Sequence, residues 1–331
     1  MGTKEAGEGG IMGGRTAIAI LIVAILWRAV ISLDGEIVFW ESLCSGIALI
    51  VLGWVLFAYM YRMSKELKGW LISNYIYQGF AVSLVVINIY ALIYYGMRWY
   101  ELLTVEAYPP MDFIFRDVRY LALVAFYCAV MWSANYPQKM YEAYISESRD
   151  KAVLHIINPF LYPRVKKLKE MGMKEMLGAL ITDERTLLVI VGLTFLWRIV
   201  ISLDYTITLG ESMVSGIVLI LVGWLFFGYI YSLSGKQRDW PDLVKVYQAI
   251  ALGVLAVNIY VLVYYWMRWL SITGAGGVAE AFVPLDYLFR DISFFALVMF
   301  YCASIVLSKF LRRAHEEYSL LSSEASKAVS T

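Results

Sequence analysis

The sequence has very little histidine, and this excludes one large class of membrane proteins. Only His155 and His315 occur among its 331 residues, and both fall outside the long apolar segments, where a b-type haem would need its axial ligands. The chain also has no His-Glu-x-x-His sequence, no cysteine pair at metal-ligand spacing, no phosphate-binding glycine loop and no Gly-x-Ser-x-Gly. The sequence therefore predicts no catalytic residue, no metal site and no cofactor, and we do not expect an enzyme.

Charged residues are scarce as well. They make up 17% of the chain against 61% hydrophobic residues, whereas a soluble domain carries about a quarter charged residues. The apolar residues gather in blocks of about 18 to 24, long enough to cross a hydrocarbon core of about 30 Å as helices. The three cysteines, Cys44, Cys128 and Cys302, lie inside these blocks and are interpreted as small buried hydrophobic residues. We expect an all-α integral membrane protein whose first partner is the lipid bilayer and which binds no nucleic acid.

One pattern of residues occurs twice along the chain. Residues 26–34 have the sequence LWRAVISLD, and residues 196–204 repeat it, 170 positions later, as LWRIVISLD. Beyond a short insertion around residues 274–277 the offset is 174, so that DFIFRD at 112–117 corresponds to DYLFRD at 286–291. Self-similarity of this length indicates an internal repeat.

Each copy of the repeat contains four apolar spans. They lie at about 16–33, 42–61, 72–97 and 113–132 in the first copy, and at about 186–203, 212–231, 243–267 and 287–307 in the second. An even number of spans brings both copies into the membrane from the same side. We therefore predict eight transmembrane helices in two tandem four-helix bundles that lie side by side, in parallel orientation, around a pseudo-two-fold axis along the membrane normal.

The distribution of lysine and arginine predicts the orientation. These residues are concentrated between the second and third spans of each copy, in the central linker and after the last span, which places those segments in the cytoplasm. The predicted parts are a cytoplasmic tail (1–14), the first membrane repeat (15–132), a basic cytoplasmic linker (133–184), the second repeat (185–307) and a cytoplasmic tail (308–331). The protein is expected in the cell membrane with both termini inside. Residues 163–177 fit either a short helix on the anionic leaflet or a solvated connector.

Polar residues also occur within the spans. Asn88 and its counterpart Asn258 lie inside the predicted third helix of each copy, where an amide must find a partner. They act either as hydrogen-bonding links between helices or as the lining of a polar cavity. Small residues in the second helix, such as Gly46 and Gly53, predict close approach of helix backbones.

A cluster of charged residues is predicted at the outer ends of the spans. Arg28 lies about 7 to 8 Å inside its span, at a rise of about 1.5 Å per residue, and is expected to reach outward or to pair with Asp117 or Glu41. Asp112 and Arg116 have the spacing of an intrahelical ion pair. The candidates for a pathway or a structural charge network are Arg28, Asp34, Glu41, Asn88, Arg98, Asp112, Arg116, Asp117, Arg198, Asp204, Glu211, Asn258, Arg268, Asp286, Arg290 and Asp291.

These observations support three hypotheses on function. The first is a channel or transporter for an ion or small polar solute, with the outer cluster of Arg, Asp and Glu at its entrance. The second is a non-catalytic, haem-free membrane subunit, or a quinone-interacting anchor, of a larger respiratory-type complex. The third is a structural membrane protein. Besides the lipid bilayer, the expected partners of the protein are other membrane subunits or copies of the same chain. The copies also differ, for example at Arg119 and its counterpart Ser293, which indicates either an asymmetric path or drift after duplication.

Overall fold

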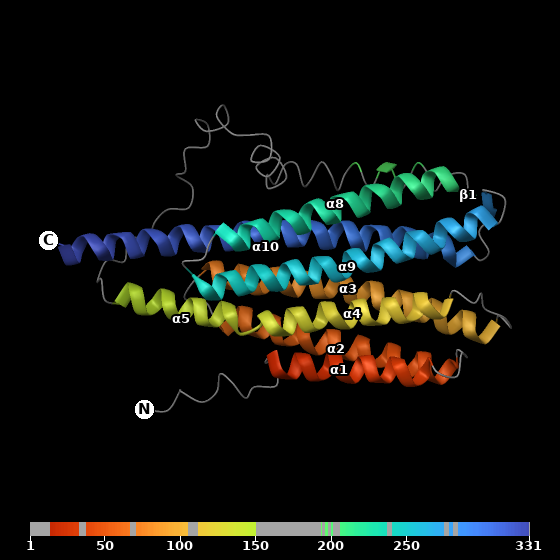
Figure 1. Ribbon diagram of the computed structural model, residues 1–331, viewed down its shortest axis with the longest axis horizontal. Helices are drawn as coiled ribbons and strands as arrows, with labels where there is room; N and C mark the ends of the chain where they lie inside the picture. The colour runs from red at the N-terminus through yellow and green to blue at the C-terminus, as the bar shows by residue number, and fades with distance from the viewer. Residues whose placement is uncertain are drawn as a thin grey trace.

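The protein is a long bundle of antiparallel helices (Figure 1). The computed structural model describes residues 14–32, 38–66, 71–104, 112–149, 206–236, 240–274, 278–280 and 284–330, together with positions 193, 196, 197 and 200. The helices are α1 (Gly14–Ile31), α2 (Phe39–Glu66), α3 (Leu71–Thr104), α4 (Asp112–Ser133), α5 (Tyr136–Arg149), α8 (Leu209–Lys236), α9 (Pro241–Gly274) and α10 (Pro284–Ser330). The short strands β1 (Thr206–Thr208) and β2 (Val278–Glu280) pair antiparallel, Thr206 opposite Glu280.

Six helical segments in the described part of the chain are long and apolar enough to cross a membrane. The protein is therefore an all-α, multi-pass membrane protein. The six segments are Phe39–Glu66, Ile72–Tyr100, Arg116–Ile145, Leu209–Gly235, Pro241–Gly274 and Ile292–Ser319. The first predicted span corresponds to α1, an apolar helix of 18 residues, and the fifth, at 186–203, lies mostly outside the described residues.

The places where helices begin follow from local sequence. Pro241 and Pro284 are the first residues of α9 and α10, where the missing N–H of proline costs no helical hydrogen bond. Pro137 lies in the first turn of α5, just after the turn at Ala134 and Asn135 that ends α4. No described helix contains a proline beyond its first turn, so the helices run long; α10 continues for 47 residues and, with α5, projects beyond the other helices at one end (Figure 1).

Helices from the two halves of the chain share one core. The most extensive contacts outside consecutive helices join α3 to α10 and α4 to α9, whereas α3 and α4 hardly touch each other. The halves are thus interleaved, and the predicted arrangement of two separate bundles side by side is wrong for the described helices. The physical reason is that a sequence pattern marks which face of a helix is buried but does not say which helix covers it.

Equivalent contacts recur in the two halves. Trp27 on α1 donates its indole N–H to the hydroxyl of Ser45 at 3.0 Å, and Trp197 donates to Ser215 at 3.1 Å. A Cβ added to Gly46 would lie 2.7 Å from the ring of Trp99. The equivalent contact, at the same distance, joins Gly216 to Trp269. The predicted close packing at the small residues of the second helix is confirmed by these contacts.

Large apolar side chains cover the outer surfaces of α1, α2 and α8. Ile18 is 61% exposed, Val51 55% and Leu221 57%, whereas the inner faces of the same helices are buried. In water such a surface would be an aggregation hazard, but in a bilayer it meets lipid tails of equal polarity. α1 and α8 lie at opposite edges of the bundle (Figure 1), so lipid-facing surfaces bound it on both sides.

The predicted central linker (133–184) begins with structure of its own. Its first part forms α5, which packs against α9, α3 and α10 and so belongs to the bundle. The segment at 163–177, for which a membrane-surface helix was one alternative, lies outside the described residues. The predicted C-terminal tail (308–331) continues α10 without a break to Ser330.

The contact at Gly53 provides a test of this packing. We expect Gly53→Ala to lower the free energy of unfolding by about 1–3 kcal/mol, the usual cost of overpacking, because the new methyl group would meet the side chains of Asn88 and Tyr127. The control is Gly228→Ala, where nothing lies within 4 Å and alanine favours the helix. Thermal unfolding in detergent measures both. Equal melting temperatures for the two variants would contradict the described packing of α2 on α3.

Candidate functional site

Two arginines share one carboxylate at the end of α1. The Nη1 of Arg28 lies 3.5 Å from Oδ1 of Asp117, and the Nε of Arg116 lies 3.1 Å from the same oxygen. Ser32 donates its hydroxyl to the other carboxylate oxygen at 2.5 Å and accepts a hydrogen bond from Arg116 at 3.4 Å. α1 and α4 are thereby joined by a network of one anion and two cations, which we call the outer cluster (Arg28, Ser32, Arg116 and Asp117).

The outer cluster is largely withdrawn from solvent. The side chain of Arg28 is 4% exposed and that of Arg116 is 7% exposed, while Asp117 is 22% exposed. The guanidinium of Arg28 also lies over the ring of Tyr120, 4.2 Å from its centroid, which adds a cation–π contact. The predicted pairing of Arg28 with Asp117 is confirmed by these contacts.

A third arginine lies one turn further into α4. Arg119 is 6% exposed, and its guanidinium carbon lies 4.2 Å from the ring centroid of Tyr94 on α3. It also lies 5.3 Å from the ring of Tyr264 and 5.5 Å from that of Tyr260, both on α9. Tyrosines from both halves therefore surround a cation that only the first half supplies, since Ser293 occupies the equivalent position of α10. We call this set of residues the tyrosine cage (Tyr94, Arg119, Tyr260 and Tyr264).

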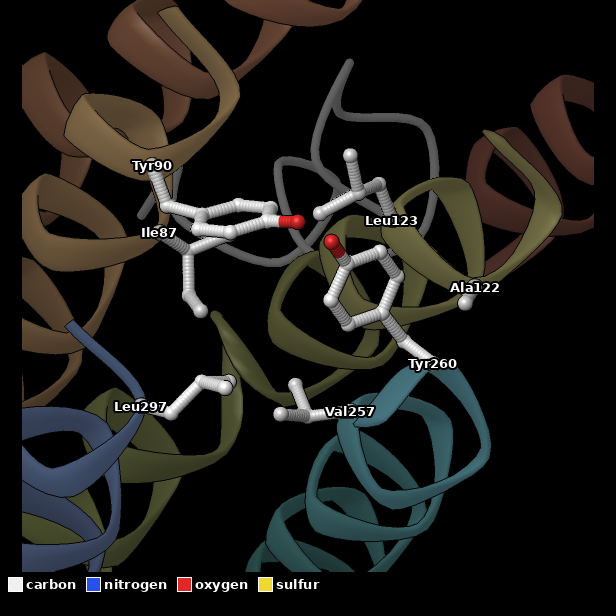
Figure 2. A pocket seen from close by; sticks show the side chains of 7 residues that line it. All are labelled: Ile87, Tyr90, Ala122, Leu123, Val257, Tyr260 and Leu297. Carbon is white, nitrogen blue, oxygen red and sulfur yellow. The ribbon is translucent and has the colours of Figure 1, made fainter. Parts of the chain in front are cut away.

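A small cavity adjoins the tyrosine cage where the four central helices meet. The rings of Tyr90 and Tyr260 approach to 5.1 Å between centroids in an edge-to-face arrangement, and their hydroxyl groups point toward one another (Figure 2). The cavity has a volume of about 10 Å³, room for about one water molecule. Its lining consists largely of equivalent residues of the two halves: Ile87 with Val257, Tyr90 with Tyr260, and Leu123 with Leu297, to which the first half adds Ala122.

The two buried asparagines have the same partner in each half. Tyr127 on α4 donates its hydroxyl to the side-chain oxygen of Asn88 at 2.6 Å, and Tyr301 on α10 donates to Asn258 at 2.5 Å. Both asparagines are fully buried, and their side-chain nitrogens have no hydrogen-bond partner among the described residues. Of the two predicted roles, the hydrogen-bonding link between helices is the one these contacts support, because the amides face neighbouring helices and not the cavity lining.

The buried charges in the described part of the chain all have one sign. The charged side chains buried there are Arg28, Arg98, Arg116 and Arg119, all from the first half. The partly exposed Asp117 neutralises one charge of this set through the ion pairs given above. Arg28, Arg116 and Arg119 are each held by contacts with charged or aromatic side chains of neighbouring positions.

Several predicted site residues lie elsewhere. Glu211 forms a capping box with Thr208 at the start of α8, each backbone N–H donating to the other side chain at 3.3 Å. Its counterpart Glu41 has no such capping box, because Val38 occupies the position equivalent to Thr208. The Oε2 of Glu41 is buried and has no hydrogen-bond partner among the described residues. Arg268 is half-buried near the end of α9. The side chains outside the described set are those of Asp34, Asp112, Arg198, Asp204, Asp286, Arg290 and Asp291.

The tyrosine cage was missed as a site by sequence reasoning. The signals were present, since Arg119 is a charged residue inside an apolar run, three positions inward from Arg116. Tyrosine pairs at spacing four, Tyr90 with Tyr94 and Tyr260 with Tyr264, lie on one helical face each. What the sequence could not supply was the contact of α4 with α9 that brings these residues together.

Comparison of the chain with protein-family models, with curated proteins and with solved structures gives no match. The class of protein is defined by the fold alone, a multi-pass α-helical membrane protein.

Replacement of the shared carboxylate tests the outer cluster. We expect Asp117→Asn to lower the free energy of unfolding by about 1–3 kcal/mol, less than the 3–5 kcal/mol for a fully buried pair because Asp117 is 22% exposed. The matched control is Glu66→Gln, which breaks the exposed pair with Arg62 and should change stability by no more than about 0.5 kcal/mol. Thermal or denaturant unfolding in detergent measures both, and an unchanged Asp117→Asn variant would contradict the role of Asp117.

Proposed function

We propose that the protein is a channel or transporter for an ion or small polar solute, whose path begins at the outer cluster and runs inward between the two halves of the chain. The observation that carries the proposal is the position of Arg119. This cation lies deep between helices of both halves, where a structural link within one half would have no need of it. An arginine at such depth is costly, and charged residues inside membranes commonly mark paths for ions or solutes.

The polar groups form a series along α4. Arg116 and Asp117 belong to the outer cluster, Arg119 follows about 4 Å further along the helix axis, and Leu123 at the cavity follows about 6 Å beyond that, at a rise of about 1.5 Å per residue. The small volume of the cavity corresponds to an occluded state in this proposal. Transport then requires that α4 and α9, or α3 and α10, move apart at their contact.

The finer architecture belongs to the same proposal. We infer that the chain arose by duplication of a four-span unit, with eight transmembrane helices and a pseudo-two-fold axis along the membrane normal passing near the cavity. The sequence repeat and the equivalent cavity-lining residues support it. The positive residues between spans favour a cell-membrane protein with both termini in the cytoplasm.

The orientation has a direct test. We expect a green fluorescent protein fused after Thr331 to be fluorescent in cells of a bacterial expression host, and a periplasm-dependent phosphatase fused at the same place to be inactive, because eight spans return the chain to the cytoplasm. The reverse result would contradict the cytoplasmic C-terminus, and with it either the even number of spans or the assigned side of the outer cluster.

Flux measurements in reconstituted liposomes test transport. The wild-type protein should give flux above protein-free vesicles, and Arg28→Gln should reduce it about tenfold by weakening the attraction of solute to the entrance. Folding should be retained, because Ser32 still donates to Asp117 between α1 and α4, and Arg116 still pairs with that carboxylate at 3.1 Å. The control is Arg312→Gln, which breaks an exposed pair with Glu316. Absence of flux for inorganic ions and small polar solutes, with a folded protein, would refute the transport proposal.

The second candidate is a non-transporting membrane subunit, haem-free and either structural or a quinone-interacting anchor of a larger complex. The observation that favours it is the closed packing at the centre, where the cavity has room for about one water molecule. Purification under mild conditions discriminates the two, since a subunit should bring partner proteins with it and a transporter should be active alone or as copies of one chain.

A further inference from the structure

Two lysines from different halves of the chain lie against one tyrosine ring, at the end of the bundle that the positive residues predict to be cytoplasmic. The ammonium nitrogen of Lys139 on α5 lies 5.8 Å from the ring centroid of Tyr136, and that of Lys245 on α9 lies 5.2 Å from the same centroid. α5 packs beside the start of α9, which brings the two lysines together (Figure 1). We call these residues the lysine–tyrosine cluster (Tyr136, Lys139 and Lys245).

The positive charge of this cluster is not neutralised within the described part of the chain. Neither lysine forms an ion pair with a described residue, and Lys139 is exposed. The carboxylate one turn further along α5, that of Glu142, accepts a hydrogen bond from Gln138 at 3.2 Å instead. The tyrosine ring attracts each ammonium group but leaves the two like charges to repel each other. An anion that contacted both lysines would offset that repulsion.

A second observation indicates what kind of molecule carries this anion. Leu252 and Ile259 follow Lys245 at successive intervals of seven residues, near one face of α9, and their side chains are 48% and 41% exposed. Leu252 lies about 10 Å from Lys245 along the axis, at a rise of about 1.5 Å per residue. The ring of Trp132 meets that of Tyr136 edge to face, with centroids 6.2 Å apart, and such rings favour the level of lipid headgroups. Lysines at the end of an apolar, lipid-facing stripe fit a molecule with an anionic head and a hydrocarbon tail.

We propose that the lysine–tyrosine cluster binds the headgroup of an anionic phospholipid, whose acyl chains lie along the exposed apolar face of α9. Lysine is a point charge on a flexible stem, and basic groups between membrane helices at the cytoplasmic side suit anionic headgroups. Because Lys139 belongs to the first half of the chain and Lys245 to the second, a lipid phosphate between them joins the halves at this end. The inference goes beyond the proposed function and does not depend on transport.

Phosphatidylglycerol is the probe, and phosphatidylcholine with the same acyl chains is its uncharged comparison. Native mass spectrometry of the full-length protein in detergent counts the lipids bound as each is added, and the titration gives the dissociation constant of the first lipid. We expect the first phosphatidylglycerol to bind more tightly than phosphatidylcholine. Lys139→Gln and Lys245→Gln should each weaken its affinity about fivefold, and the double variant about 30-fold, the usual effect of one and of two lysines near an anionic lipid.

The chain offers a matched control. Lys65 on α2 also lies over a tyrosine, Tyr61, with its ammonium nitrogen 4.3 Å from the ring centroid, but no second lysine of the described residues contacts that ring. Lys65→Gln removes the same charge and the same kind of contact, and it should leave the first lipid in place. Lys245→Arg keeps the charge and should retain the affinity. Should Lys245→Gln fail to fold, Lys139→Gln carries the test, because Lys139 is exposed.

The outcomes separate this inference from transport and from other anions. Tighter binding of phosphatidylglycerol that is weakened in the variants of Lys139 and Lys245, and kept in Lys65→Gln, supports the lipid site whether or not liposomes show flux. Equal affinity for the two lipids overturns it. A preference for phosphatidylglycerol that is unchanged in the double variant shows a general attraction to positive surface and also overturns it. Inorganic phosphate at the concentration of the lipid should not displace it; displacement would assign the site to a soluble anion and overturn the lipid as its occupant.

Discussion

The hydrocarbon core of a bilayer offers no water, so each polar group that the helices carry into it needs a partner within the protein. The outer cluster satisfies this requirement with one carboxylate. Asp117 meets Arg28 from α1 and Arg116 from its own helix, and Ser32 completes the network with its hydroxyl. The position of α1 against α4 depends on that carboxylate, and through α4 so do the tyrosine cage and the contact with the second half. Deeper in the bundle, Asn88 and Asn258 each accept a hydrogen bond from a tyrosine of a neighbouring helix.

Because the two halves of the chain are interleaved, buried polar residues of both halves meet in one place. Since α4 packs on α9 and α3 on α10, residues from both copies of the repeat meet at the centre. Tyr90 and Tyr260 come within 5.1 Å of each other only because of this arrangement, and Arg119 reaches the tyrosines of α9 for the same reason.

The sequence was informative where the physical cause is local. Apolar length predicted membrane helices, glycines at Gly46 and Gly53 predicted close helix contacts, and the depth of Arg28 predicted a partner such as Asp117; all three agree with the structure. The spacing of Thr208 and Glu211 is also a local signature, that of a capping box. Sequence reasoning assigned Glu211 to the charge cluster instead.

What sequence reasoning could not supply is the pairing of distant helices. A helical stripe of tyrosines around Tyr90 is equally consistent with packing on α4 or on α10, because both present apolar faces of similar shape. The tyrosine cage therefore became visible only with the contact of α4 and α9 in place. The asymmetry of Arg119 and Ser293 was readable from the start, but its meaning depends on where the two positions lie relative to the interface.

The central claim is that water and solute reach the interface between the halves, and the accessibility of position 293 tests it most directly. Ser293→Cys is nearly isosteric and lies on α10 at a site that is 3% exposed. In a protein whose Cys44, Cys128 and Cys302 have been replaced, the account predicts that an anionic, membrane-impermeant thiol reagent modifies this cysteine in liposomes. It should leave Ser304→Cys unmodified, a control that is equally buried on the same helix. Equal protection of both cysteines in a folded protein would contradict the account and show that the interface is a permanent structural contact.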